Sequence, residues 1–148
     1  MIGIILGSSS DLPVAQTGLD LLESLNIPHR VWTLSAHRTP DRLRQAVEDS
    51  PEIKVWVGFA GLAAHLCGAI AAHTIRPVIG VPIASGALMG QDALISMVQM
   101  PPGIPVGVVG IDNARNGLLL AAQILALSDP VVESALSSHR EEGRAAYD

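Results

Sequence analysis

Short apolar runs alternate along the chain with longer segments in which apolar residues recur every three or four positions. The short runs are rich in Ile and Val and are bounded by Gly, Pro or polar residues, which is typical of buried strands. Three of the longer segments follow Ser, Thr or Asp and place Pro13, Pro40 or Pro130 in the first turn, which is typical of helix starts. The pattern predicts strands at 2–6, 30–34, 53–59, 77–81 and 106–109, and helices at 11–25, 40–49, 62–74, 91–99, 112–127 and from 130 onward.

Alternation of five strands with helices predicts an α/β fold of three layers around a parallel sheet. Right-handed crossovers favour the flavodoxin-like strand order 2-1-3-4-5. We find no repeat, low-complexity segment or linker, so residues 1–148 are expected to form a single domain. Ligands of such sheets bind at the carboxyl ends of the strands, where strand order reverses. We therefore expect the segments 7–11, 35–39 and 59–65 to lie together at the carboxyl edge of the sheet.

Charge is scarce: charged residues make up 16% of the chain, against about 25% in soluble domains. Between Val55 and Gly110 the only formal charges are Arg76 and Asp92. A stretch this poor in charge belongs in a doubly covered sheet, in an oligomer interface or in a membrane. Residues 55–75 are long enough to span a bilayer. Their pattern changes midway from β-branched to Ala/Leu-rich, however, which favours a buried strand followed by a helix.

The overall charge and the cysteine count exclude further classes of protein. A net charge of −5 leaves no broad basic surface for nucleic acid. The single Cys67 rules out a disulfide framework and a cysteine zinc cluster. No signal-peptide pattern begins the chain. We therefore expect a cytoplasmic protein with no nucleic-acid or membrane partner.

The first candidate site is Gly7–Asp11, which joins the first strand to the first helix. Backbone amides at a helix start, together with small hydroxyl residues, suit an anion such as phosphate. Neither common nucleotide-binding glycine motif is present, so an ordinary turn capped by Ser10 or Asp11 is an equal alternative. Asp11 would repel phosphate, but it could accept hydrogen bonds from ribose hydroxyls.

The second candidate is Ser35-Ala36-His37-Arg38-Thr39-Pro40, another strand-to-helix turn. His37 can exchange protons near neutral pH, and Arg38 can form two hydrogen bonds to a phosphate or carboxylate. The alternative is a surface loop in which Thr39 caps the helix. Arg42 and Arg44 fall on the following helix and are expected to be solvated.

The third candidate is the segment 60–68, whose small residues allow a ligand to approach the backbone. His65 is expected more often to be a buried structural histidine than a ligand contact, and Cys67 a small buried hydrophobe. His29, His73 and His139 show no partner pattern. No metal-binding histidine spacing occurs. A Ser/His/Asp hydrolase built on Ser8, His37 and Asp11 would lack the G-x-S-x-G turn.

Taken together, these motifs resemble the N5-carboxyaminoimidazole ribonucleotide mutase family of purine biosynthesis. The resemblance runs from residue 2 to about residue 127. It rests on the segments 7–11, 35–40, 63–66, 77–82 and 99–107, which read Gly-Ser-Ser-Ser-Asp, Ser-Ala-His-Arg-Thr-Pro, Ala-Ala-His-Leu, Pro-Val-Ile-Gly-Val-Pro, and Gln-Met-Pro through Pro-Val-Gly.

The resemblance implies a homo-octamer of flavodoxin-like subunits. It implies an isomerase that converts N5-carboxyaminoimidazole ribonucleotide reversibly to 4-carboxyaminoimidazole ribonucleotide, without metal, ATP or an organic cofactor. It assigns His37 as the catalytic acid and base. It places the ribose phosphate of this small-molecule substrate on Ser8, Ser10, Asp11, Ser35 and Arg38, and its base and carboxylate on Ala60, Gly61, His65 and Leu66.

Two alternatives remain open. The related carboxylase branch uses free carbon dioxide, but it typically carries Lys in place of Arg38 and lacks a histidine matching His65. A non-catalytic flavin- or nucleotide-binding module would have few aromatic side chains available, namely Trp32, Trp56, Phe59 and Tyr147. The chain also departs from the mutases in having Leu62 where they usually have Gly, and Cys67 where they usually have Pro. Leu62 is expected to add bulk beside the carboxylate pocket.

Overall fold

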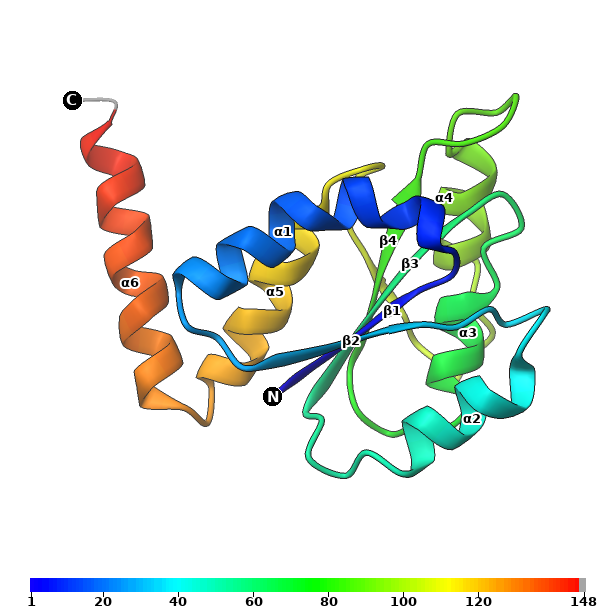
Figure 1. Cartoon of the computed structure of the whole chain (residues 1–148), viewed down its shortest axis with the longest axis horizontal. Coiled ribbons are helices and arrows are strands. Elements are labelled where there is room, and N and C mark those ends of the chain that lie inside the picture. The colour runs from blue at the N-terminus through cyan, green and yellow to red at the C-terminus, as the bar shows by residue number, and fades with distance from the viewer. Residues whose placement is uncertain (147–148) are drawn as a thin grey trace.

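A five-stranded parallel sheet forms the centre of the molecule in the computed structural model, which describes residues 1–146 (Figure 1). The strand order is β2-β1-β3-β4-β5, which confirms the predicted flavodoxin-like arrangement. The register places Ile4 of β1 between Val31 of β2 and Val57 of β3. The strands are β1 (Ile2–Leu6), β2 (His29–Thr33), β3 (Val55–Gly61), β4 (Val78–Ile83) and β5 (Gly107–Val108).

Helices cover both faces of this sheet. They are α1 (Leu12–Ser24), α2 (Pro40–Glu48), α3 (Leu66–Ala71), α4 (Gln91–Val98), α5 (Ala114–Ala126) and α6 (Pro130–Ala145), with the short 3-10 helix η1 (Ser9–Asp11) before α1. One core lies between the sheet and α1 with α5, and the other lies between the sheet and α2, α3 and α4. The three layers predicted from the sequence are therefore confirmed (Figure 1).

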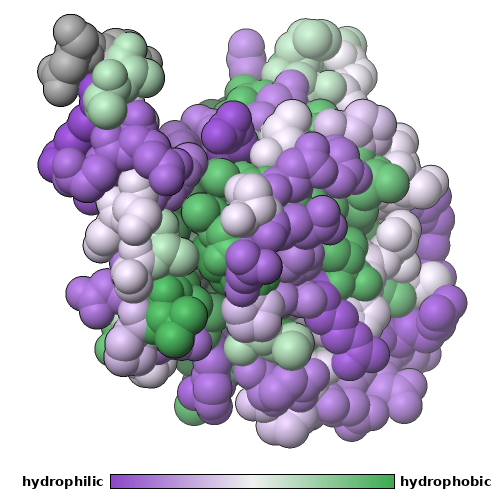
Figure 2. All heavy atoms as spheres, turned by 60° about the vertical axis from the view of Figure 1, so that its left-hand side comes forward, coloured by the Kyte–Doolittle hydropathy of each residue, from purple (hydrophilic) through white to green (hydrophobic). Residues whose placement is uncertain are grey.

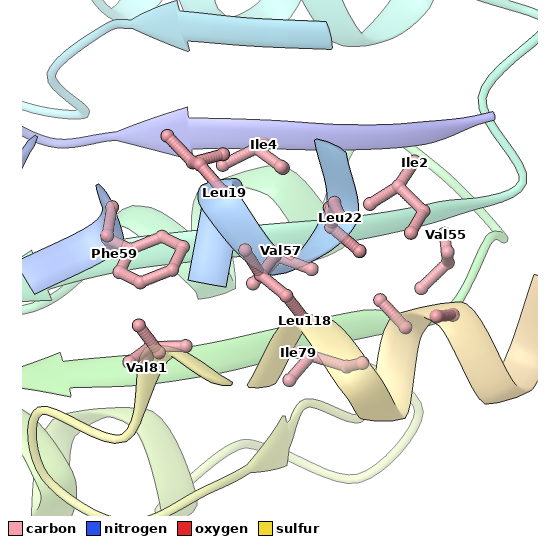
Figure 3. Packing of buried hydrophobic residues seen from close by; sticks show 14 of the residues in the cluster. Ile2, Ile4, Leu19, Leu22, Val55, Val57, Phe59, Ile79, Val81 and Leu118 are labelled. Atoms are coloured by element: carbon pink, nitrogen blue, oxygen red, sulfur yellow. The ribbon is translucent and has the colours of Figure 1, made fainter. Parts of the chain in front are cut away.

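Alternation along the strands divides the core between the two faces. Ile2, Ile4 and Leu6 of β1 lie in the core beneath α1 and α5, whereas Ile5 lies in the opposite one. In β3, Val57 and Trp56 divide in the same way. Figure 3 shows side chains of α1 and α5 packed over the first of these faces. Because both faces are buried, these strands appear in the sequence as continuous apolar runs rather than alternating ones.

The third helix is much shorter than the predicted 62–74, because it begins only at Leu66 and ends at Ala71. The strand β3 continues to Gly61, and Leu62 then adopts the left-handed conformation with φ of +55°. That conformation cannot start a right-handed helix, so residues 62–65 form a loop. The stretch 55–75 is thus a strand followed by a helix, as predicted. No helix within residues 1–146 is long and apolar enough to cross a membrane.

Two helix caps differ from those predicted. Ser8 caps the 3-10 turn, rather than Ser10 or Asp11, and Thr39 makes no side-chain cap for α2. Asp129, by contrast, accepts hydrogen bonds from the amides of Val131 and Val132 at the start of α6. Of the residues in α6, Val132 is the buried one, and much of the surface of this helix is hydrophilic (Figure 2).

The helices α1 and α5 approach closely at Gly18. A Cβ atom built at Gly18 would lie 2.9 Å from the carbonyl oxygen of Ala114, so only glycine fits this crossing. The buried side of α1 is accordingly formed by Ala15, Leu19 and Leu22. Val14 and Leu25 pack against the same core but are only partly buried.

Candidate active site

The carboxyl ends of β1, β2, β3 and β4 surround a cavity of about 640 Å³. It lies over β1, where strand order reverses, as expected for a ligand site of this fold. The loops after the first three strands meet there, as the sequence predicted. Every residue that the family resemblance assigned to catalysis or substrate binding lines the cavity, namely Ser8, Ser10, Asp11, Ser35, His37, Arg38, Ala60, Gly61, His65 and Leu66.

The loop after β1 is held by hydrogen bonds among its own side chains. The amide of Ser8 donates to Asp11 Oδ2 at 2.9 Å, and Ser8 Oγ accepts from the amide of Ser10 at 3.3 Å. The hydroxyl of Ser10 donates to Ser8 Oγ at 2.9 Å. This reciprocal arrangement is a capping box, and it fixes both hydroxyls at the wall of the cavity.

Asp11 is the buried acid of this site, with 6% of its surface exposed. Burial raises the pKa of its carboxyl above the ordinary value, while hydrogen bonds from Ser8 and Ser10 and the charge of Arg38 act in the opposite direction. Burial is the largest of these influences. An ionised Asp11 therefore carries an unfavourable desolvation cost that hydrogen bonds from a bound hydroxyl-bearing ligand would reduce.

The loop after β2 is built around Ser35. Its Oγ accepts hydrogen bonds from the amides of His37 and Arg38 at 3.3 and 3.2 Å. Thr39 Oγ1 accepts from the amide of Ser35 at 2.9 Å and donates to the Ser35 carbonyl at 3.1 Å. Thr39 thus closes this turn instead of capping α2, and the turn holds the backbone of His37 and Arg38 in place.

Arg38 links the two loops, because its Nη2 donates to the carbonyl oxygen of Gly7 at 3.2 Å. Its guanidinium is exposed at the cavity and brings positive charge toward Asp11 and the two serine hydroxyls. Arg42 and Arg44 are exposed on α2, and Arg44 forms an ion pair with Glu48 at 3.1 Å, so both are solvated as predicted.

His37 and His65 meet across the cavity. His37 Nε2 lies 2.8 Å from His65 Nδ1, and the ring centroids are 5.0 Å apart at an interplanar angle of 82°. His65 stands just before α3, and its ring is exposed rather than buried in the core, so the structural interpretation of this residue was wrong. Two neutral imidazoles at this separation share a hydrogen bond in which one ring donates and the other accepts.

The end of β4 adds residues that the sequence motifs did not include. Ile83, Ala84 and Ser85 line the cavity, and Ser85 Oγ occupies the space that a side chain at Gly61 would need. The amide of Ala84 donates to Asp112 Oδ1 at 2.8 Å, which fixes this turn. The position of 82–90 after a strand of the same parallel sheet was the signal that could have identified it.

The other histidines and the cysteine considered in the sequence analysis do not line the cavity. His73 pairs with Glu48 at 3.4 Å, and His29 contacts the carbonyl oxygen of Ile27 at 2.9 Å. Cys67 is fully buried and donates to the Gly58 carbonyl, and burial raises the pKa of its thiol to about 12, so it is the inert hydrophobe predicted. Within the part of the chain described, no three His, Cys, Asp or Glu side chains lie close enough together to hold a metal ion.

A hydrolytic triad does not form in this cavity. Asp11 is bonded to Ser8 and Ser10 rather than to a histidine. The hydrogen-bond partner that the structure gives His37 Nε2 is His65. The cavity instead combines two imidazoles, one guanidinium and several hydroxyls with Ala, Gly, Leu and Ile residues. This arrangement can bind an anionic, hydroxyl-bearing molecule and move a proton at its far end.

Comparison with known proteins points to one group. The model of the AIR carboxylase family matches residues 1–146. An N5-carboxyaminoimidazole ribonucleotide mutase of Pyrococcus abyssi is 50% identical over 95% of this chain and 82% of its own length. The mutase of Escherichia coli K12 is 48% identical over 95% of this chain and 85% of its own length. The crystal structure of Treponema denticola PurE has a TM-score of 0.88 and 26% identity, and the match covers 99% of this chain and 92% of that one.

Proposed function

The chain belongs to the AIR carboxylase family, and from this premise we propose that it is the isomerase that interconverts N5-carboxyaminoimidazole ribonucleotide and 4-carboxyaminoimidazole ribonucleotide in purine biosynthesis. The observation that carries the proposal is the His37–His65 contact of 2.8 Å in a cavity that also holds Arg38. We propose that residues 1–148 act as one catalytic domain.

The phosphate and ribose of the substrate fit the polar half of the cavity. Arg38 supplies a guanidinium for the phosphate, and the hydroxyls of Ser8, Ser10 and Ser35 supply further polar contacts. Asp11 lies beside them and would repel a phosphate, so it is assigned to the ribose hydroxyls. Hydrogen bonds from those hydroxyls would also offset the desolvation of its buried carboxylate.

Transfer of the carboxyl group requires that one proton is donated to the nitrogen and that another is removed from C4. The bond between N5 and the carboxyl carbon breaks, carbon dioxide forms, and protonated His37 gives a proton to the nitrogen that keeps the electron pair. C4 then attacks carbon dioxide, and His37 takes up the proton that C4 loses. Atoms and charge balance over the two steps, so the reaction requires no added cofactor.

His65 and the small residues are assigned to the base and carboxylate. His65 lies within hydrogen-bond distance of His37, and it can orient that ring or contact the carboxylate when the substrate enters. Ala60, Gly61 and Leu66 provide the apolar surface beside it. Such a surface excludes water from carbon dioxide between the two steps.

An assay with two substrates tests this function against its nearest alternative. The mutase converts N5-carboxyaminoimidazole ribonucleotide directly, whereas the carboxylase requires aminoimidazole ribonucleotide plus carbon dioxide. We expect turnover with the first substrate at low bicarbonate. Turnover only with the second pair of reactants would assign the chain to the carboxylase branch.

A flavin- or nucleotide-binding module is disfavoured by the positions of the aromatic residues. Trp56 and Phe59 are buried in the two cores, and Trp32 packs against Trp56 with 5.4 Å between ring centroids. None of these three lines the cavity, so none can stack on a flavin there. Tyr147 lies outside the described residues. A purified protein with flavin absorbance would support this alternative.

We also propose that the chain assembles as a homo-octamer in the cytoplasm. The doubly covered sheet accounts for only part of the charge-poor stretch 55–110, because Ile75, Leu88, Ile95 and Val98 within it are exposed. Contact with further copies would bury such side chains. Light scattering should give eight times the mass of one chain, and a monomer would contradict the proposal.

A further inference from the structure

Ser85 brings a side-chain hydroxyl to the cavity from the turn that follows β4. Its Oγ fills the space that a Cβ atom at Gly61 would need, so the absence of a side chain at Gly61 admits this hydroxyl to the cavity wall. The described residues 1–146 give Ser85 Oγ no hydrogen-bond partner. No buried side-chain oxygen in that part of the chain lacks one, so the unpaired hydroxyl is accessible from the cavity.

The serines on the other side of the cavity are held by their own loops. Ser8 Oγ accepts hydrogen bonds from the amide and the hydroxyl of Ser10. Ser35 Oγ accepts from the amides of His37 and Arg38. These hydroxyls help to build the turns after β1 and β2. The hydroxyl of Ser85 has no such structural task within its turn and can turn toward a ligand.

The backbone that carries Ser85 is fixed from the start of α5. The amide of Ala84 donates to Asp112 Oδ1 at 2.8 Å, and the amide of Asp112 donates to the carbonyl oxygen of Pro82 at 2.8 Å. Asp112 thus holds the chain on both sides of Ile83, immediately before Ser85. A hydroxyl on a backbone held in this way loses little further freedom when it binds a ligand.

The strand order determines which part of the substrate Ser85 can meet. Arg38 follows β2 and Ser85 follows β4, and two strands lie between them, so these strand ends are roughly 14 Å apart. The phosphate is assigned to Arg38 and the serines after β1. The base and its carboxyl group then extend toward the ends of β3 and β4, where Ser85 lies.

A carboxylate at that end of the cavity needs hydrogen-bond donors. Arg38 is taken by the phosphate, and Asp11 carries the wrong charge. Among the lining residues that follow β3 and β4, the side chains with a nitrogen or oxygen donor are those of His65 and Ser85. His65 already shares a hydrogen bond with His37. The hydroxyl of Ser85 is the uncommitted donor, and a hydrogen bond from it to a carboxylate would be charge-assisted.

We propose that Ser85 is a specificity-determining residue, whose hydroxyl donates a hydrogen bond to the carboxylate of the substrate. This inference rests on the proposed mutase function. Ser85 thereby distinguishes the carboxylated ribonucleotides from aminoimidazole ribonucleotide, which has the same phosphate and ribose but no carboxyl group.

Two variants of Ser85 and two other serine variants test this role. Ser85→Ala removes the hydroxyl and keeps the Cβ atom, whereas Ser85→Cys keeps the size of the side chain and offers only a weak donor. Ser10→Ala is the comparison at the phosphate end of the cavity. Ser24→Ala is the matched control, because Ser24 ends α1, donates to the Leu21 carbonyl and does not line the cavity. Thermal unfolding checks that each protein is folded.

The readout separates the carboxylate from the rest of the substrate. KM is measured for N5-carboxyaminoimidazole ribonucleotide, and Ki is measured for aminoimidazole ribonucleotide as a competitive inhibitor of the same reaction. We expect Ser85→Ala to raise KM roughly tenfold or more, the effect of one hydrogen bond to a charged group, and to leave Ki unchanged. Ser85→Cys should raise KM by less. Ser10→Ala should raise KM and Ki together, because both ligands carry the phosphate, and Ser24→Ala should change neither.

The role of Ser85 and the proposed function fail in different ways. An unchanged KM in folded Ser85→Ala and Ser85→Cys, or equal increases in KM and Ki, would overturn the recognition of the carboxylate by Ser85. Failure of the wild type to convert N5-carboxyaminoimidazole ribonucleotide would instead overturn the proposed function.

Discussion

His37 Nε2 lies 2.8 Å from His65 Nδ1, although 28 positions separate the two residues along the chain. The contact exists because β2 and β3 flank β1, so the loops that follow them meet above its carboxyl end. It places two groups that can give and accept protons in the same cavity as the guanidinium of Arg38.

Replacing His37 by Asn should nearly abolish turnover while leaving the fold intact. The side chain is exposed, so its loss removes no core contact. General acid–base catalysis by one residue contributes about 10²–10⁴ in rate, and we expect kcat to fall by that order. His139→Asn is the control, since His139 lies on α6 away from the cavity. A folded His37→Asn protein with near-normal turnover would contradict the assignment.

Replacing His65 by Asn should have a smaller effect. His37 would lose the hydrogen-bond partner that orients its ring, which corresponds to about 1–2 kcal/mol of transition-state stabilisation, or about 5- to 30-fold in kcat/KM. A steady-state comparison with His37→Asn under the same conditions checks the order of the two effects. A loss from His65→Asn as large as that from His37→Asn would show that His65 itself is the principal proton-transfer group.

Asp11 should make stability depend on pH in the acidic range. The pKa of its carboxyl is raised in the folded protein, chiefly by burial, so the folded state holds this proton at pH values where the unfolded chain has lost it. The contribution of Asp11 is therefore fully favourable below about pH 4, the ordinary range of the carboxyl, and declines as pH rises through the raised pKa.

Urea unfolding of wild type and Asp11→Asn at several pH values measures this contribution. Asn does not ionise, so the stability of the wild type relative to Asp11→Asn should fall as pH increases from about 4. A difference that grows with pH would mean that hydrogen bonds from Ser8 and Ser10 outweigh burial.

Gly18→Ala should destabilise the protein by about 1–3 kcal/mol, the usual cost of overpacking. The new Cβ would meet the backbone of Ala114 at 2.9 Å, and α1 and α5 would have to separate. Gly143→Ala on α6 is the matched control, because no atom lies within 4 Å of its added Cβ. Alanine there should stabilise the helix by about 0.5–1 kcal/mol. Equal shifts in the midpoint of thermal unfolding would contradict the close helix contact.

The strands of the sheet could be predicted because each is marked by a short apolar run in the sequence itself. Runs such as Ile2–Leu6 are apolar at every position, and both faces of β1 are indeed buried. The start of the third helix was not predictable in the same way. Residues 62–65 belong to an Ala/Leu-rich segment with good helix propensity, whereas the left-handed turn at Leu62 depends on tertiary contacts with the loop after β4. Helix propensity is a weak preference that such contacts override.

The site was predictable to the extent that its residues follow strands. The loops containing Ser8, Ser35 and Gly61 each come after a strand, so parallel topology places them on one rim. Which side chains touch was not predictable from spacing. The pairing of His37 with His65, and the placement of Ser85 against Gly61, arise from the order of the strands and the closeness of their ends.

The central position of β1 has a consequence for how the protein acquires activity. β1 is synthesised first, and its two neighbours β2 and β3 follow it in the chain, so a growing polypeptide can add strands outward from one template. The cavity is completed only when β4 and the turn at Ala84 and Ser85 have been synthesised, because residues of this turn line it. Because strands separated by crossover helices pair slowly, recovery of turnover during refolding should follow the formation of the first three strands rather than accompany it.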